Sequence, residues 1–241
     1  MPSSINTFNE SSLHKTLKTL YSLNNNGITE YEKNGYIYDI WTEDGVIEIQ
    51  TKNLSKLAEK LQKTLDTGIK VTLVHPLVTT KSISLYDENM ELLSSRKSPK
   101  KNNIYHIFRE LTKLYSILLN PLFKLEIVEI SMTEERMKTN EPTQSKNQRR
   151  RFKKDWIKIN KKLDEILEVK TFSTKKDYLN LLPFSKNELF SAKEMEDFLR
   201  KNKLSSNAKD NSHYYLWLLN KMNLIELVEV KNRRKYYSIS K

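Results

Sequence analysis

The stretch GYIYDIWTEDGVIEIQTKNLSKLAEKLQKTLDTGIKVTLVHP, residues 35–76, organises the expected fold. Its pattern predicts a strand over 36–41, a tight turn, a second strand over 46–51, a helix, and a short buried strand over 69–74. Asp44-Gly45 is a strong hairpin signal, because a type I′ turn needs positive φ at both central residues. The helix is marked by leucines at helical spacing: Leu54, Leu57, Leu61 and Leu65.

The hairpin predicts which polar side chains meet. If Asp44-Gly45 forms a two-residue loop, Asp39 pairs with Gln50, and alternate residues share a face. Glu48 and Lys52 then project on the same side as Asp39. Asp39 and Glu48 become diagonal neighbours, with Cβ atoms about 7–8 Å apart. Two carboxylates at that separation can share one hard cation, and Mg²⁺ prefers oxygen ligands.

These residues carry a resemblance to a known family. Asp39, separated by eight residues from Glu48-Ile49-Gln50 and followed by a helix and a strand, resembles the PD-(D/E)XK core of restriction endonucleases and related nucleases. The resemblance implies a metal-dependent DNA nuclease, with Mg²⁺ or Mn²⁺ held by Asp39, Glu48 and the Ile49 carbonyl. It covers residues 35–76 of the 241-residue chain, and implies that Gln50 orients the attacking water.

The chain departs from the family pattern in two places. Tyr38 stands where the family name has Pro, and Gln50 stands where Lys is usual. Because glutamine is neutral, it cannot stabilise an anionic transition state as lysine does, and Lys52 is the candidate that supplies this charge. An amphipathic strand with its polar residues facing water explains the same pattern without catalysis. The segments EIQTKN and RKSPKKN also resemble those of an uncharacterised bacterial family.

Composition favours a polyanionic partner. The chain has 42 basic and 30 acidic residues, a net charge of +12 and a pI near 9.5. Lysine and arginine bind nucleic acid by releasing counterions from the phosphate backbone, although a general lysine bias gives the same total. The absence of cysteine excludes disulfides and thiolate zinc sites. With no secretory leader or membrane span in the sequence, we expect a soluble, cytoplasmic protein.

The N-terminal region, residues 1–140, is expected to form one mixed α/β domain of restriction-endonuclease-like type. A hairpin is predicted after residue 80, an apolar stripe over 104–118 predicts a long helix, and alternation over 122–132 predicts a strand. The parallel connections of such a sheet require crossovers, so helices should pack on a mixed sheet.

Residues 141–173 are expected to form a basic linker and helix. Between 144 and 162 there are nine lysine or arginine residues and one acid, which is clustering and not a uniform bias. Apolar residues from Phe152 to Ile166 step by four and three, which is typical of a coiled-coil seam. A solvated charged helix is the alternative to a nucleic-acid contact. The candidate contacts are Arg149, Arg150, Arg151, Lys153 and Lys154.

Residues 174–241 resemble a winged-helix domain, because three short helices precede a basic terminal hairpin. The resemblance implies that the third helix enters the major groove of DNA with its N-terminal residues. A protein-interaction module is the alternative. The implied DNA contacts are Lys209, Asn211, Ser212 and His213 on the helix, with Arg233 and Arg234 in the wing.

Together these patterns predict a metal-dependent DNA endonuclease with a DNA-binding domain, working as a homodimer if it cuts duplexes. The alternative is a non-catalytic DNA-binding regulator on a degenerate nuclease scaffold. RNA is a further candidate ligand, since basic segments are not specific to DNA.

Overall fold

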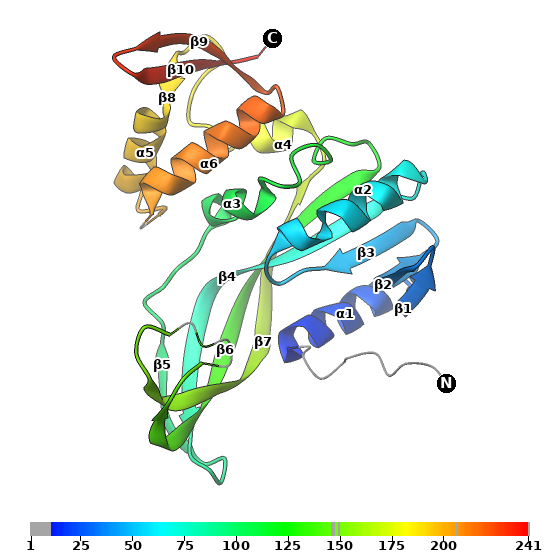
Figure 1. Ribbon diagram of the computed structural model, residues 1–241, viewed down its shortest axis with the longest axis vertical. Helices are drawn as coiled ribbons and strands as arrows, with labels where there is room; N and C mark the ends of the chain where they lie inside the picture. Colours follow the sequence, from blue (N-terminus) through cyan, green and yellow to red (C-terminus); the bar gives the residue numbers. More distant parts are fainter. Residues whose placement is uncertain (1–10, 146–147, 149, 206, 241) are drawn as a thin grey trace.

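The computed structural model describes residues 11–145, 148, 150–205 and 207–240. It confirms the expected mixed α/β class: a large mixed sheet carries helices on its faces (Figure 1). The sheet order is β1-β2-β3-β4-β6-β7, with β5 paired to the far half of β4. The strands are β1 (Ile28–Lys33), β2 (Tyr36–Thr42), β3 (Gly45–Ile49), β4 (Val71–Tyr86), β5 (Leu92–Lys97), β6 (Phe123–Thr143) and β7 (Lys154–Phe172).

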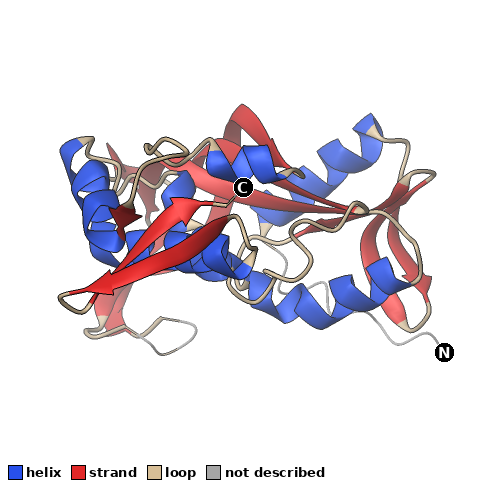
Figure 2. Ribbon diagram, turned by 90° about the horizontal axis from the view of Figure 1, so that it is seen from above, coloured by secondary structure: helices blue, strands red, loops and turns tan. Residues whose placement is uncertain are grey.

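Helices cover both faces of this sheet, as the view from above shows (Figure 2). On one face, Leu13 and Leu17 of α1 pack on a core that includes Ile47 and Val128. On the other face, α2 and α3 pack on a larger core that includes Val46. β3, β4 and β6 are parallel, and α2 provides the crossover from β3 to β4. The helical segments are α1 (Ser12–Asn24), η2 (Leu54–Leu57), α2 (Ala58–Asp66), η3 (Ile104–His106) and α3 (Phe108–Leu111).

The turn between β2 and β3 forms one residue earlier than the sequence suggested. Thr42 pairs with Gly45, so Glu43 and Asp44 make up the loop. Gly45 has φ +139° and lies so close to the start of β4 that an added Cβ would be 2.2 Å from the Lys70 carbonyl oxygen. Glycine is required here by the close approach of two backbones.

This shift changes the partner of Asp39. The predicted pairing of Asp39 with Gln50 is wrong: the ladder runs from Thr42 and Gly45 to Ile40 and Ile47, and its regular pairing ends before Asp39. A shift of two residues keeps the faces of β3, because side chains repeat every second position. The alternation of β2 is broken at Asp39, since Tyr38 packs in the core beside α2 and Ile40 in the core beside α1. Ile47 therefore still lies on the face away from Val46, as expected.

The segment expected to be a basic linker and helix is a strand. β7 pairs along nearly the whole of β6 and together they form a long arm, which points away from the C-terminal helices in Figure 1. Register shifts at three positions of the β6–β7 ladder between Glu129 and Arg136 each add a residue on β7. Because each bulge offsets the two-residue alternation, the apolar spacing of β7 imitates the helical period.

The long helix predicted over 104–118 is also wrong. Only η3 and the four residues of α3 are regular, and turns follow to residue 119. Backbone bonds there join residues three apart, as in Leu114 N to the Leu111 oxygen (2.9 Å) and Ile117 N to the Leu114 oxygen (2.9 Å). Except for the exposed Tyr115, the apolar stripe is nonetheless buried, so the periodicity marked the core-facing side chains but not an α-helix.

Residues 174–240 form a smaller unit beside the sheet. Ser191 and Glu194 make a capping box at the start of α5. The unit is not separate in its packing, because Tyr215 of α6 lies 4.4 Å from Phe108 of α3 between ring centroids. Its elements are α4 (Lys175–Leu179), β8 (Phe190–Ser191), α5 (Ala192–Lys201), α6 (Ala208–Lys221), β9 (Ile225–Lys231) and β10 (Arg234–Ile239), with sheet order β8-β10-β9.

Candidate functional site

The two acids of the hairpin bind main-chain amides where the β2–β3 ladder opens. Asp39 Oδ2 accepts from the Ile49 amide at 2.8 Å, and Glu48 Oε1 accepts from the Asp39 amide at 3.3 Å. Beyond the pair of Ile40 and Ile47, the Asp39 and Ile49 amides thus donate to side-chain carboxylates instead of to main-chain carbonyls of the neighbouring strand. The two acids are adjacent, but the expectation that they share one face is wrong: Asp39 is held from the side of α1 and Glu48 from the side of α2.

Asp39 is held from the α1 side. His14 Nε2 lies 2.7 Å from the Ile49 carbonyl oxygen and 3.5 Å from Asp39 Oδ2. Since both partners are acceptors, Nε2 carries a proton and donates it. Burial would raise the pKa of Asp39, but hydrogen bonds from His14 and the Ile49 amide, with the positive charge of Lys18 nearby, hold it below its usual range.

Glu48 is held from the α2 side. Its side chain is 3% exposed, and Oε1 lies 2.5 Å from Lys60 Nζ. Lys60 also donates to the Ile37 carbonyl oxygen at 2.6 Å. Burial, followed by repulsion from Asp39, raises the pKa of Glu48 to about 7, and the attraction of Lys60 only partly offsets it.

This arrangement does not fit a divalent cation. Two of the three expected ligand atoms, Asp39 Oδ2 and the Ile49 oxygen, converge on a protonated nitrogen of His14. The third expected ligand, Glu48, is paired with Lys60. Within the described residues, no group of three or more His, Asp or Glu side chains is placed to hold a metal. A cation would have to displace both His14 and Lys60.

The other two predicted catalytic residues are Gln50, which is held through its main chain, and Lys52. The Gln50 carbonyl oxygen accepts from His75 Nδ1 at 2.6 Å, and the Gln50 amide donates to Val74. Lys52 follows β3 in an exposed loop and lies beside Lys161 of β7. The structure therefore does not gather Lys52 with Glu48.

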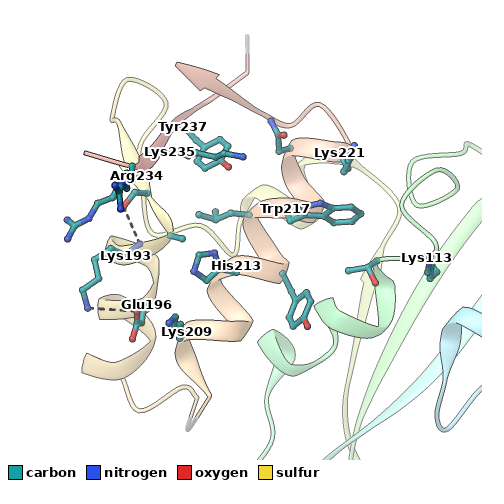
Figure 3. Close-up of a pocket in the computed structure, with 17 residues that line it drawn as sticks. Lys113, Lys193, Glu196, Lys209, His213, Trp217, Lys221, Arg234, Lys235 and Tyr237 are labelled. Carbon is teal, nitrogen blue, oxygen red and sulfur yellow. Dashed lines mark hydrogen bonds and ion pairs between the residues drawn. The ribbon is translucent and has the colours of Figure 1, made fainter. Parts of the chain in front are cut away.

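A second candidate site is a groove of about 1230 Å³ in the C-terminal unit (Figure 3). It lies between α5, α6 and the β9–β10 hairpin, with the segment after α3 on its far side. Seven lining residues are lysine or arginine, while Glu196 is the acidic one. The basic residues are Lys113, Lys193, Lys209, Lys221, Arg233, Arg234 and Lys235.

The groove includes four of the six DNA contacts predicted in this unit. Lys209, His213, Arg233 and Arg234 line it. The other two do not face it: Asn211 is 6% exposed and Nδ2 donates to Ser205 Oγ at 2.8 Å, and Ser212 is fully buried and donates to the Lys209 carbonyl oxygen.

Trp217 is the main residue that the sequence reasoning missed. It is 40% exposed, lines the groove, and lies 6.0 Å from the ring of Tyr115. The signal was present in the sequence, because Lys209, His213 and Trp217 recur every four residues and so share one face of α6.

The other predicted basic contacts lie in the connection from β6 to β7, except Lys154, which begins β7. Arg149 is outside the described residues. Arg150 Nη1 donates to the Trp156 carbonyl oxygen at 2.9 Å, and its guanidinium carbon lies 4.0 Å from the centre of the Trp156 ring. Arg151 lies over the Phe152 ring at 5.2 Å. Lys153 and Lys154 are exposed.

These features define a mixed α/β protein with a closed acid pair in its large sheet and a basic groove in a smaller C-terminal unit. Residues 11–173 match the family described as a domain of unknown function (DUF8091), and the chain belongs to that family. The match ends one residue past β7, so it contains the large sheet and, of the groove lining, only Thr112 and Lys113. Within the described residues, no helix is long and apolar enough to cross a membrane.

An uncharacterized protein of Treponema pallidum (strain Nichols) is 33% identical to this chain over 172 residues. The alignment covers 71% of this chain and 65% of the relative, so the chain spans less than two thirds of that protein's length. No solved structure matches the chain.

Proposed function

We propose that this protein binds duplex DNA in the groove of its C-terminal unit. The observation that carries the proposal is the basic lining of that groove, where seven lysine and arginine side chains come from four separate segments. Fixed positive charge on a concave surface attracts the phosphate backbone and releases its counterions.

The shape of the unit supports a duplex as the ligand. α6 has 14 residues and presents Lys209, His213 and Trp217 along one face, and a helix of this length fits the major groove of B-DNA. Arg233 and Arg234 stand on the hairpin beside it, where they can contact phosphates. The order α4, β8, α5, α6, β9, β10 agrees with the winged-helix resemblance. RNA suits this face less, because the major groove of A-form RNA is deep and narrow.

Binding of a labelled duplex to the full chain, measured by fluorescence anisotropy over a range of salt, tests the proposal. We expect the logarithm of the binding constant to fall linearly with the logarithm of the salt concentration. The variant R233Q/R234Q should lower the magnitude of that slope by about 2, since each phosphate contact contributes about 0.9. The control K186Q/K201Q removes the same charge from exposed lysines outside the groove. Equal slopes for the two variants, or no binding by the parent protein, would reject the groove.

A second candidate is a metal-dependent nuclease, favoured by the arrangement of elements around the acids. A helix, three antiparallel strands, a crossover helix and a parallel strand follow in the order of the nuclease core, and the Glu48 carboxylate contacts the Asp39 amide. We rank it second because His14 and Lys60 occupy the oxygen atoms that a cation needs.

Cleavage of supercoiled plasmid with Mg²⁺ or Mn²⁺ tests this second candidate. Activity that is lost in D39A and in E48A, but kept in the turn variant D44A, supports it. If D39A and E48A cut as well as the parent protein, the acid pair is not catalytic.

A further inference from the structure

The arm carries a basic cluster that neither the groove nor the acid pair uses. Its centre is Glu134 of β6, which is 3% exposed. Three cations contact that carboxylate: Arg136 Nη2 at 2.6 Å, Lys158 Nζ at 2.6 Å and Lys81 Nζ at 3.3 Å. Although burial opposes ionisation, hydrogen bonds from Lys158 and Arg136 hold the pKa of Glu134 at about 2, so it stays charged.

Two further lysines are crowded against this cluster. Lys161 of β7 pairs across the ladder with Glu134, and Lys52 reaches it from the loop after β3. Burial, followed by repulsion from Lys52 and Lys158, lowers the pKa of Lys161 to about 8. Four cations therefore lie around one carboxylate, with Lys52 against the fourth, and this excess of positive charge would be relieved by a bound anion.

The cluster continues along the arm as a stripe. Glu134 and Arg136 are two residues apart on β6. On β7, Lys158 lies across from Arg136, and Trp156 lies across from Lys138. The Arg136 guanidinium carbon lies 3.6 Å from the centre of the Trp156 ring. From Trp156 to Lys161 a strand rises about 16 Å at 3.3 Å per residue. That length spans several phosphates of a nucleic-acid strand, which are spaced about 3.4 Å along the axis.

We propose that Lys52, Lys158 and Lys161 form a phosphate-binding site on the arm, which holds the sugar-phosphate backbone of nucleic acid. The choice of ligand rests on the proposed DNA binding by the C-terminal groove. The site itself rests on the crowding of cations along β6 and β7. A stripe of this length suits a polyanion better than a single phosphate ion.

Salt dependence of duplex binding by the full chain is the first test. The variant K52Q/K161Q keeps every ion pair of Glu134 and should lower the magnitude of the salt slope by about 2. The control K56Q/K162Q removes equal charge nearby from two exposed lysines, and Lys162 points to the other face of β7. Thermal unfolding of both variants checks that each is folded.

The outcomes separate this site from the groove. If R233Q/R234Q lowers the slope while K52Q/K161Q matches its control, the arm site is wrong and the groove stands. If only K52Q/K161Q lowers it, the arm binds and the groove proposal fails. If the parent protein does not bind DNA, both fail.

Protection from acetylation provides a second readout that needs no variant. At pH 8 a large share of Lys161 is unprotonated and reacts with an acetylating reagent, because its pKa is about 8. Bound DNA should reduce modification of Lys161 severalfold by covering it and by favouring its protonated form. Lys162 serves as the internal reference. Equal modification of Lys161 with and without DNA, measured by mass spectrometry, would overturn the proposal.

Discussion

Lys60 determines whether Glu48 can stay ionised in the folded protein. The Glu48 carboxylate is almost fully buried and its pKa is about 7, so ionisation already disfavours the folded state. A buried acid with a raised pKa contributes most stability below its unfolded pKa, and this contribution is lost as pH rises toward the folded pKa. For Glu48 that window runs from about 4.5 to about 7.

Replacing Lys60 with methionine should therefore destabilise the protein in a pH-dependent way. Without its partner, the folded pKa of Glu48 rises further, and the loss of stability continues to higher pH. We expect K60M to lower the free energy of unfolding by about 3–5 kcal/mol at pH 8.5, the usual result of breaking a buried pair, and by much less at pH 5. Urea denaturation at the two pH values measures this.

Lys63 on the same helix gives the matched control. It pairs with Glu59 on the exposed side of α2, so K63M should have a small effect that is equal at both pH values. A loss in K60M that does not change between pH 5 and 8.5 would show that Glu48 is not the group that responds.

At the level of elements, Gly45 fixes how the hairpin meets β4. Its φ of +139° and the Lys70 carbonyl oxygen, 2.2 Å from an added Cβ, leave no room for a side chain. Backbone strain alone should make G45A lower the free energy of unfolding by about 1–3 kcal/mol. The total loss should be larger, because β4 must also move to make room for the added Cβ. G35A is the control: Gly35 has φ +74° but open space around it, so only the strain applies. Equal losses in the two variants would contradict the close approach.

The same hairpin shows what the sequence could and could not predict. Alternation placed Ile47 and Ile49 on one face, and the Asp44-Gly45 signal located the turn. The register depended on the approach of β4, which is distant in sequence, so local turn preferences could not supply it. The partners of the acids, His14 and Lys60, come from two helices whose packing follows from the whole sheet.

β7 shows a second limit of sequence reasoning. Its apolar residues follow a helical period only because bulges interrupt the ladder, and bulges depend on the partner strand. The sequence predicts the positive charge of this segment but not its placement: Lys158 joins Lys81 and Arg136 on Glu134 only once β7 lies along β6. The C-terminal unit was easier to predict, because its helices and hairpin follow from local caps and turns.

On the scale of the whole molecule, one core joins the sheet to the C-terminal unit. Tyr215 of α6 lies 4.4 Å from Phe108 and 5.7 Å from Tyr105, between ring centroids. Its hydroxyl donates to the Tyr178 carbonyl oxygen at 2.7 Å. Because Tyr215 is fully buried at this junction, unfolding of either unit exposes the other.

We therefore expect the parent protein to unfold in a single calorimetric transition, and Y215A to lose this coupling. Removing a large buried aromatic side chain typically costs about 3–5 kcal/mol, and here the cost falls on the contact between the two units. Two transitions should appear in Y215A, with the C-terminal unit melting first because it has the smaller core.

Y215F is the conservative control: it keeps the ring and should lower stability by only about 1–3 kcal/mol, the cost of an unpaired buried carbonyl, with one transition retained. A single transition in Y215A would show that the contacts of Tyr215 with Phe108 and Tyr105 are not needed to couple the two units. Two transitions in the parent protein would show that the groove and the arm belong to independently folding parts.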